Sequence, residues 1–516
     1  MNGAESLVRT LVAGGVELCF TNPGTSEMHF VAALDKVDGM RCVLGLFEGV
    51  VTGAADGYYR MARRSASTLL HLGPGLANGV ANLHNAKKAG SGIVNIVGEH
   101  ALHHIKHDAP LTADIEGIAR PVSHWVKTSQ SSRAVAQDGA LAIRAARQSP
   151  GQIATLILPA DTAWNEADGM VTTPAAQPAA RVAHESVVSA ARALARGNGT
   201  LLLLGGAGLM ERSLEWAGRI AANTGCRIMA SGFNARVQRG AGRVEVNRVP
   251  YVVELALETL KDVRHVVLAG AKYPVSFFAY PDKPSVLAPD GCASMRLAGI
   301  EEDIEAALEA LAAELGAVAT PPRFVAAPKR PELPGGRVTP EGIGAVLGAL
   351  LPENVIVVDE SVSTGRGLFP PTAGTPPHDW LNNMGGSIGF GLPVAVGAAI
   401  ACPDRKVIAL EGDGSAMYTL QALWTMAREA LNVTIVVLAN RSYEILKGEF
   451  TNVGAGAPGQ KAIDMMSLDR PNLDWLALAR GHGIEAGRAE NLEQFAHEFR
   501  RALAVQGPYL IELVMA

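Results

Sequence analysis

The sequence predicts an α/β protein of three doubly wound parallel-sheet domains. Short runs of β-branched residues alternate with helical stretches, which is typical of parallel sheets covered by helices on both faces. Glycine turns separate many of these runs from the helix that follows. Proline-containing stretches after Trp164 and Leu315 divide the 516 residues, so we expect domains at residues 1–165, 183–316 and 337–516.

The first segment repeats a unit of strand, glycine turn and helix. A helical face before residue 13 precedes the expected strand VELCF, and TNPGTSE then opens another helix. The same unit recurs through MRCVLGLFEGVV, ASTLLHLGPGLA and SGIVNIVGEH, and it closes at ATLILPAD, where the last strand meets a proline. The segment therefore reads as one complete parallel sheet.

The second and third segments follow the same plan. Expected strands of the second are GTLLLLGGAG, CRIMAS and HVVLAGAKY, and those of the third are NVIVVDES, KVIALEGDGS, VTIVVLANRS and YLIELVMA. Most strands of the third segment end in polar residues or glycine. Ligands of open parallel sheets bind at the carboxyl ends of the strands, so these ends are where function is expected.

Composition excludes several classes of partner and compartment. A formal net charge of -5 leaves no basic stripe, so we expect no binding to nucleic acid or to anionic membranes. The longest apolar run is too short to span a bilayer, and the N-terminus lacks the pattern of a signal peptide. The 5 cysteines are scattered without CxxC spacing, which is typical of reduced thiols in a cytoplasmic protein.

Asp413 is the first candidate ligand, because it lies between Gly412 and Gly414 where an apolar strand ends. A lone aspartate in such a turn is usually a cap. Asn440, however, ends the next strand after a single-helix crossover, and strands joined in this way are usually neighbours. Two adjacent oxygen ligands suit Mg²⁺, and the bare N–H groups of the glycines and of Ser415 suit phosphate.

The stretch GDGSAMYTLQALWTMAREALNVTIVVLANRSY resembles the thiamine diphosphate motif, which begins with GDG and ends in a pair of asparagines. Ala439 replaces the first asparagine, whereas Asn440 matches the second, which is the metal ligand of the family. The resemblance implies that the Ser442 carbonyl completes the metal shell. It extends over nearly the whole chain and is closest to the benzoylformate decarboxylase and acetolactate synthase branches of the thiamine diphosphate-dependent 2-oxo acid decarboxylases and carboligases.

Other motifs carry the same resemblance. Glu48, in EGVVTGAADGYYRMA, could simply start a helix, but its apolar neighbours should desolvate it, and it matches the glutamate that binds the aminopyrimidine ring. In NNMGGSIGFG, Gly386 matches the carbonyl that accepts from the aminopyrimidine amine, and Ile388 matches the residue that bends the cofactor. Ser363, in DESVST, matches a hydroxyl that contacts the diphosphate.

The resemblance implies a thiamine diphosphate- and Mg²⁺-dependent enzyme that decarboxylates a 2-oxo acid through an enamine. Attack of the enamine on a second carbonyl gives a hydroxy ketone, as in acetolactate synthases, whereas protonation gives an aldehyde, as in benzoylformate decarboxylase. Phe277 and Phe278 stand where that decarboxylase carries its second active-site histidine, so we expect carboligation, with simple decarboxylation as the alternative. LLLLGGAG lacks a full dinucleotide fingerprint, so FAD is not expected.

Several residues are candidates for contact with substrate. His71, at the end of STLLH, matches a proton-transfer histidine, and Thr25 and Ser26 match the position of a substrate-binding serine, although each could instead serve only in capping. A histidine-rich run is spaced to share one helical face and consists of His100, His103, His104 and His107. A zinc site, a solvated face and acid–base work by His104 all remain open for this run.

The family resemblance also implies an assembly. Glu48 and the metal motif belong to different domains, which in this family meet across a subunit interface, so we expect a homodimer or homotetramer with active sites between subunits. Three other classes are weaker. GGSIG fits a serine hydrolase elbow, but PPHDWLNNM is not expected to be the buried strand that the elbow needs. A nicotinamide oxidoreductase lacks its fingerprint, and Glu48 argues against a noncatalytic relative.

Overall fold

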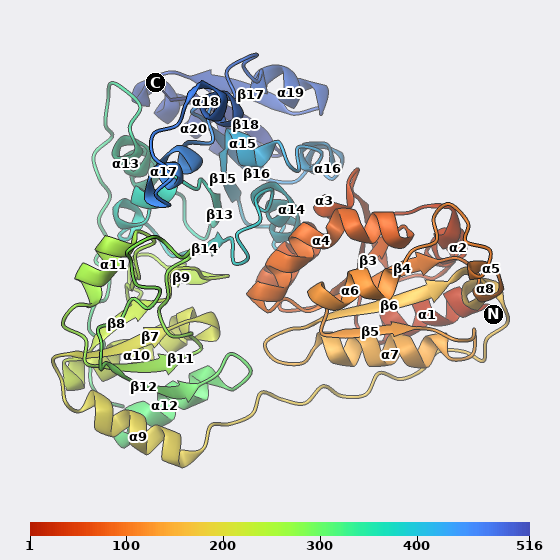
Figure 1. Ribbon diagram of the computed structural model, residues 1–516, viewed down its shortest axis with the longest axis horizontal. Coiled ribbons are helices and arrows are strands. Elements are labelled where there is room, and N and C mark those ends of the chain that lie inside the picture. The colour runs from red at the N-terminus through yellow and green to blue at the C-terminus, as the bar shows by residue number, and fades with distance from the viewer. Residues whose placement is uncertain (516) are drawn as a thin grey trace.

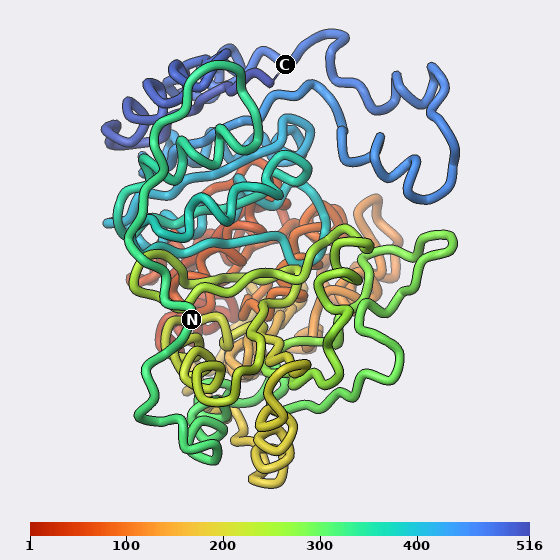
Figure 2. The backbone as a smooth tube through the Cα atoms, turned by 90° about the vertical axis from the view of Figure 1, so that its left-hand side faces the viewer, coloured from red at the N-terminus to blue at the C-terminus, as the bar shows by residue number. Residues whose placement is uncertain are grey.

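The computed structural model describes residues 1–515, which form three sheets with helices on their faces (Figure 1). All pairings between strands are parallel except that of β14 with β9, so the predicted α/β class is confirmed. Within these residues, no helix is long and apolar enough to cross a membrane. In the turned view of Figure 2 the C-terminal third lies above the other two parts.

The first sheet has six strands in the order β2-β1-β3-β4-β6-β5. Its strands are β1 (Leu18–Asn22), β2 (Arg41–Leu44), β3 (Ala66–Leu70), β4 (Ile93–Glu99), β5 (Trp125–Thr128) and β6 (Ile153–Pro159). Its helices are α1 (Gly3–Ala13), η1 (Thr25–Glu27), α2 (Met28–Lys36), α3 (Glu48–Ala62), α4 (Leu72–Ala89), α5 (Leu102–Ile105), α6 (Ile115–Ala119), η2 (Arg120–Val122), α7 (Val135–Ala146) and α8 (Ala160–Trp164). The buried, β-branched β4 and β6 lie inside this sheet, as expected for strands covered on both faces.

The second sheet has five strands in the order β10-β8-β7-β11-β12. Its strands are β7 (Thr200–Leu204), β8 (Arg227–Ala230), β10 (Asn247–Arg248), β11 (His265–Ala269) and β12 (Ala293–Ala298). Its helices are α9 (His184–Leu194), η3 (Gly206–Leu209), α10 (Glu211–Thr224), α11 (Val253–Leu260) and α12 (Ile304–Glu314). A long connection without helix or strand joins α8 to α9, where the sequence predicts a linker (Figure 1).

The third sheet has seven strands in the order β17-β18-β16-β15-β13-β14-β9. Its strands are β9 (Val237–Arg239), β13 (Ile356–Glu360), β14 (His378–Asn382), β15 (Val407–Gly412), β16 (Val433–Ala439), β17 (Glu485–Ala489) and β18 (Tyr509–Val514). Its helices are α13 (Pro340–Leu350), η4 (Thr364–Gly367), η5 (Pro370–Thr372), α14 (Gly391–Ala401), α15 (Asp413–Ala416), α16 (Ala422–Arg428), α17 (Glu444–Asn452), α18 (Gln460–Met466), α19 (Trp475–Gly481) and α20 (Leu492–Ala504).

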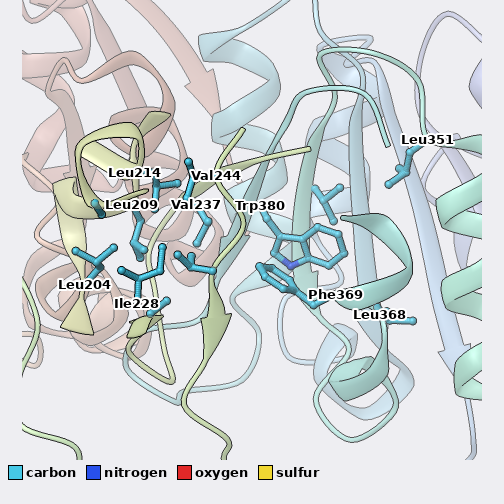
Figure 3. Packing of buried hydrophobic residues seen from close by; sticks show 14 of the residues in the cluster. Leu204, Leu209, Leu214, Ile228, Val237, Val244, Leu351, Leu368, Phe369 and Trp380 are labelled. Carbon is cyan, nitrogen blue, oxygen red and sulfur yellow. The ribbon is translucent and has the colours of Figure 1, made fainter. Parts of the chain in front are cut away.

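Strand β14 corrects one expectation from the sequence. PPHDWLNNM reads as irregular because it is polar, yet all five residues of β14 are buried. Ion pairs explain this, because Asp379 accepts from Arg236 at 2.6 Å and from Arg405 at 2.6 Å. The edge strand beside β14 is β9, which comes from the middle of the chain, so the apolar cluster around Trp380 and Val237 is continuous between the second and third sheets (Figure 3).

Helices α3 and α14 cross at a distance that only glycine permits. A Cβ on Gly397 would lie 1.9 Å from the Ala54 carbonyl oxygen, and one on Gly57 would lie 2.2 Å from the Val394 carbonyl oxygen. The backbones of the two helices are therefore in direct contact. Because α3 belongs to the first sheet and α14 to the third, this crossing fixes the two parts relative to each other (Figure 1).

We expect Gly397→Ala to destabilise the protein by about 2 kcal/mol or more, because the new methyl group must push the two helices apart. Scanning calorimetry should find a lower melting temperature than for the unmodified chain. Gly448→Ala, in α17, is the matched control, since a Cβ there meets nothing within 4 Å and alanine favours a helix. A Gly397→Ala protein that melts together with the control would contradict the proposed backbone contact.

His378 is a buried titratable group next to the apolar cluster around Trp380. Its Nδ1–H donates to the Pro376 carbonyl at 2.8 Å, while Nε2 has no hydrogen-bond partner among residues 1–515. Burial, together with the nearby positive charge of Arg239, lowers the pKa of His378 to about 3. Protonation in the folded state is therefore disfavoured, because the cation would have neither solvent nor an acceptor at Nε2.

The pKa of His378 predicts a loss of stability in acid. An unfolded histidine takes a proton below about pH 6.5 while the folded ring stays neutral, so stability is complete above that pH and falls below it. At pH 5 the loss is about 2 kcal/mol. His378→Gln cannot titrate, so its melting temperature should fall less between pH 7 and pH 5 than that of the unmodified protein. Equal falls would refute this assignment.

Candidate cofactor and substrate site

The third sheet brings the ends of four parallel strands together, in the order β16-β15-β13-β14. Their carboxyl ends share one edge of the sheet, where ligands of such folds bind. The loops that follow these four ends carry Asn440, Asp413, Ser363 and Gly386 respectively. The prediction that β15 and β16 are neighbours is confirmed, since Gly412 lies opposite Leu438 in their pairing.

Asp413 and Asn440 are joined through the backbone of the second loop. Asp413 Oδ2 accepts from the Arg441 N–H at 2.6 Å, and Oδ1 accepts from the Gly414 N–H at 2.9 Å. Asn440 Oδ1 accepts from the Ser442 N–H at 3.0 Å. Arg441 has a φ of 57°, which a residue with a side chain rarely adopts. Such backbone strain is typical of a functional loop, and here it accompanies the hydrogen bond from the Arg441 N–H to Asp413.

The donor set fits a hard divalent cation. Asp413 is 3% exposed, and burial raises its pKa to about 6. Among residues 1–515 no side chain of lysine, arginine or histidine forms an ion pair with its carboxylate, which accepts from the backbone N–H groups of Arg441 and Gly414. The carboxylate is thus buried and partnered only by backbone N–H groups, and the amide oxygen of Asn440 lies on the neighbouring loop. Carboxylate, amide and backbone oxygens are the ligands that Mg²⁺ takes.

The remaining loop residues lie close together at this edge. A Cβ on Gly414 would lie 2.4 Å from Tyr443 Cε1, so only glycine fits between the two loops. Ser415 is buried in α15, and its Oγ lies near Gly412. Ser363 is the residue before η4, in the loop that follows β13. These residues therefore line the same edge as Asp413.

The loop that carries Gly386 and Ile388 is held by asparagines. Asn383 Oδ1 accepts from the N–H groups of Gly385 at 3.0 Å and Gly386 at 2.9 Å. Gly386 has a φ of 79°, a conformation that favours glycine. The side-chain amide of Asn85, on α4, donates to the Ser387 carbonyl and accepts from the Ser387 N–H. Asparagine side chains therefore hold the backbone on both sides of Ile388.

Glu48 is the first residue of α3 and is 9% exposed, so it is both a helix-start residue and a buried acid. Its Oε2 accepts from Asn78 Nδ2, on α4, at 3.0 Å. Its Oε1 faces Gly75, where a Cβ would lie 3.2 Å away. Among residues 1–515, the hydrogen-bond partner of this carboxylate thus comes from the same sheet unit and not from the loops that carry Asp413 and Asn440.

His71 precedes α4 and forms a contact that the sequence did not reveal. Its Nδ1 lies 2.8 Å from Oε2 of Glu27, the last residue of η1. Thr25 and Ser26 occupy the same turn, with Thr25 exposed and Ser26 half-buried. Glu27 also accepts from the Gly24 N–H at 2.8 Å. An acid three residues after Gly24 resembles a capping pattern, but its partner His71 is 44 residues away.

The histidine-rich run does not form the single helical face predicted from its spacing. α5 spans only Leu102–Ile105, and the rings of His100, His104 and His107 lie in series, tilted against each other, with centroids 5.4 and 5.6 Å apart. His103 turns away, and its Nδ1 lies 3.7 Å from Asp161 Oδ2. Among the described residues no group of three or more His, Cys, Asp or Glu is arranged to hold a metal. A zinc site here therefore has no support.

An aromatic cluster adjoins the Gly386 loop. Phe277 lies at its centre, with ring centroids 5.1 Å from Phe233, 5.8 Å from Tyr251 and 4.8 Å from Phe278. A Cβ on Gly386 would lie 2.8 Å from Phe277 Cζ. Phe277 thus presents an apolar ring to this loop, and Phe278 packs against Phe277.

The hydrolase reading of GGSIG fails for a different reason from the one expected. A buried strand does precede it, but β14 ends at Asn382, five residues before Ser387. A nucleophile elbow places its serine directly between strand and helix. Ser387 lies instead in a loop whose backbone is bound by Asn85.

Family models match both ends of the chain. The model described as "Thiamine pyrophosphate enzyme, N-terminal TPP binding domain" matches residues 1–118. The model described as "Thiamine pyrophosphate enzyme, C-terminal TPP binding domain" matches residues 371–513. These two matches cover Glu48 and His71 in the first part, and Gly386, Asp413 and Asn440 in the second.

Whole proteins are similar over their full length. IlvX of Mycobacterium tuberculosis, named as a candidate acetolactate synthase large subunit, is 50% identical over 100% of this chain and 99% of its own. A benzoylformate decarboxylase of Pseudomonas aeruginosa is 29% identical over 97% of this chain and 96% of its own. Among solved structures, a thiamine diphosphate-dependent 4-hydroxybenzoylformate decarboxylase of Rhodococcus jostii RHA1 superposes with a TM-score of 0.86 at 24% identity, covering 100% and 99% of the two chains. At that identity the superposition establishes the fold alone.

Proposed function

This chain belongs to the family of thiamine pyrophosphate enzymes, and we propose that it decarboxylates a 2-oxo acid and ligates the remaining acyl group to a second carbonyl. The observation that carries the proposal is the shared edge of β16, β15, β13 and β14, where one carboxylate, one amide and two glycine-rich loops converge. Full-length similarity to a candidate acetolactate synthase supports carboligation, and so does the absence of a proton donor at Phe277 and Phe278.

Thiamine diphosphate, when bound, supplies a nucleophilic carbon and an electron sink for the loss of CO₂. Asp413, Asn440 and the Ser442 carbonyl would hold Mg²⁺, which neutralises the diphosphate. Gly412, Gly414, Ser415 and Ser363 would line the diphosphate, because they lie on the loops of the same edge. The Gly386 carbonyl would accept from the aminopyrimidine amine, and Ile388 would keep the two rings bent towards each other.

Glu48 would hold the proton that the aminopyrimidine ring needs. It is buried at the start of α3, and the hydrogen bond from Asn78 fixes one carboxylate oxygen. A buried acid whose orientation is fixed can exchange a proton with a bound ring without competition from water. His71 would move a proton at the substrate, with Thr25, Ser26 and His104 as further candidate contacts.

We also propose that two copies of the chain complete each site. In one chain the Glu48 carboxylate is bound by Asn78, while Asp413 lies on the loops of the third sheet. A homodimer, or a homotetramer built from two of them, would bring Glu48 of one copy to the metal loops of the other. Closed two-fold symmetry of this kind is the commonest arrangement of soluble oligomers.

Removal of Asp413 should weaken metal-dependent cofactor binding. Isothermal calorimetry should detect uptake of thiamine diphosphate by the demetallated protein only after Mg²⁺ is added. Asp413→Ala should weaken this uptake by about tenfold or more, which corresponds to about 1.4 kcal/mol or more. Asp404→Ala, an exposed aspartate before β15, is the matched control. Uptake that is equally tight without Mg²⁺ would contradict the metal site.

The reaction itself is tested with a panel of 2-oxo acids. The holoprotein should release CO₂ and form a hydroxy ketone, whereas an aldehyde as the main product would favour simple decarboxylation. Glu48→Gln should still bind the cofactor but exchange its thiazolium C2 proton with deuterium oxide more slowly by about 10²-fold or more, the scale of acid–base catalysis. Unchanged exchange would remove Glu48 from this role.

Mixing the two inactive variants tests the shared site. If Glu48 and Asp413 of different copies meet, re-associated Glu48→Gln and Asp413→Ala chains should regain roughly a quarter of the original activity, because half of the dimers are mixed and each has one intact site of two. Each variant incubated alone is the control. No recovery, despite exchange of subunits seen by native mass spectrometry, would place both residues in the same copy.

A further inference from the structure

A buried carboxylate, Glu27, lies against the ring of His71, and no motif in the sequence assigns it a role. We propose that Glu27 is the positioning residue that sets the tautomer of His71 and offsets its charge, which rests on the proposed function of this site.

The geometry defines which ring nitrogen faces the carboxylate. His71 Nδ1 lies 2.8 Å from Glu27 Oε2, and a carboxylate can only accept, so the neutral ring must carry its proton on Nδ1. The lone pair is then on Nε2. The side chain of His71 is 24% exposed while that of Glu27 is 1% exposed, so the ring is partly open and its partner is fully enclosed.

Glu27 is held in a space that only glycines leave open. A Cβ on Gly98, in β4, would lie 1.6 Å from Glu27 Oε1, and one on Gly24 would lie 2.1 Å from His71 Nδ1. Any side chain at either position would push the Glu27 carboxylate or the His71 ring out of its present place. Two separate glycines thus create room for the pair, one for the carboxylate and one for the imidazole.

The second oxygen of Glu27 shows that capping alone does not explain the residue. Oε2 already accepts from both His71 and the Gly24 N–H, whereas Oε1 is buried without a hydrogen-bond partner among the described residues. Burying a carboxylate in this way costs free energy. A helix cap can be formed by an uncharged amide or hydroxyl. The negative charge of Glu27 is therefore explained by its contact with the ring of His71.

Gly75 connects this pair to the cofactor acid. A Cβ on Gly75 would lie 3.2 Å from Glu48 Oε1 and 3.3 Å from the Cβ of His71. Glu48 and His71 thus flank the same backbone position at the start of α4. His71 therefore lies beside the residue expected to contact the cofactor.

The positions of the protons on this pair can be followed through one transfer. When Nε2 takes a proton from the reacting substrate, Nδ1–H stays in place and the positive imidazolium faces the Glu27 carboxylate. When Nε2 returns the proton, the ring goes back to the tautomer that it had at the start. The same division of labour between an orienting carboxylate and a proton-transferring imidazole occurs in hydrolase triads.

The tautomer can be measured without turnover. Protein labelled with ¹⁵N-histidine should give a neutral His71 ring protonated on Nδ1, with its signals identified by their loss in His71→Asn. Glu27→Met removes the acceptor at similar length and should yield a mixture with the Nε2–H form, as should Gly98→Ala, which leaves both partners intact. A ring protonated mainly on Nε2 in the original protein, or an unchanged tautomer in Glu27→Met, would overturn the proposal.

Kinetics separate charge from hydrogen bonding. Glu27→Gln keeps an acceptor but loses the charge, so its kcat should fall by about 10²-fold. The kcat of Glu27→Met should fall further. Mg²⁺-dependent uptake of the cofactor should stay unchanged in both variants. Glu17→Gln, half-exposed and paired with Arg64, is the control. An unchanged kcat in Glu27→Gln would refute the role of the charge. If the original protein turned over no 2-oxo acid, the proposed function would fail, whereas the tautomer measurement would still decide the pairing.

Discussion

The crossing of α3 and α14 is the constraint that fixes, within one chain, Glu48 of the first sheet relative to the loops of the third. α3 begins at Glu48, and α14 begins at Gly391, directly after the loop that carries Gly386 and Ile388. Because their backbones touch at Gly57 and Gly397, neither helix can slide or rotate without a clash. The contact therefore transmits the position of the first sheet to the loops of the third.

One face of α4 adds to this constraint. Asn78, Asn82 and Asn85 are spaced by four and three residues, which places them on one side of the helix. Asn78 holds the Glu48 carboxylate, Asn82 donates to the Gly389 carbonyl at 3.1 Å, and Asn85 binds Ser387. Amide side chains can both donate and accept, so they satisfy irregular backbone where an apolar face could not. A single helix thus orders both the acid and the loop.

The sequence predicts those parts of the site that local pattern encodes. Strand ends after apolar runs, and the spacing of Asp413 and Asn440, were sufficient to find the edge of the third sheet. Residues whose role depends on distant partners were missed. β14 reads as irregular because its Asp379 is neutralised by Arg236, 143 residues away, and Glu27 reads as a cap because His71 is 44 residues away. Local propensity contains no information about such pairs.

The carboxylates at the edge of the third sheet bear on how a phosphate could bind there. Glu360 and Glu411 lie opposite each other on β13 and β15, and burial raises the pKa of both. Glu360 accepts from the Phe390 and Gly391 N–H groups at the start of α14, which favours its ionised form, so Glu411 is the one that keeps a proton. Even so, Glu360 and Asp413 leave negative charge close to the loops. A diphosphate would be repelled by these carboxylates at short range, where screening is weak. An anionic cofactor tail is therefore compatible with this edge only if a cation lies between it and Asp413, and the oxygen ligands of Asp413 and Asn440 are where such a cation would bind.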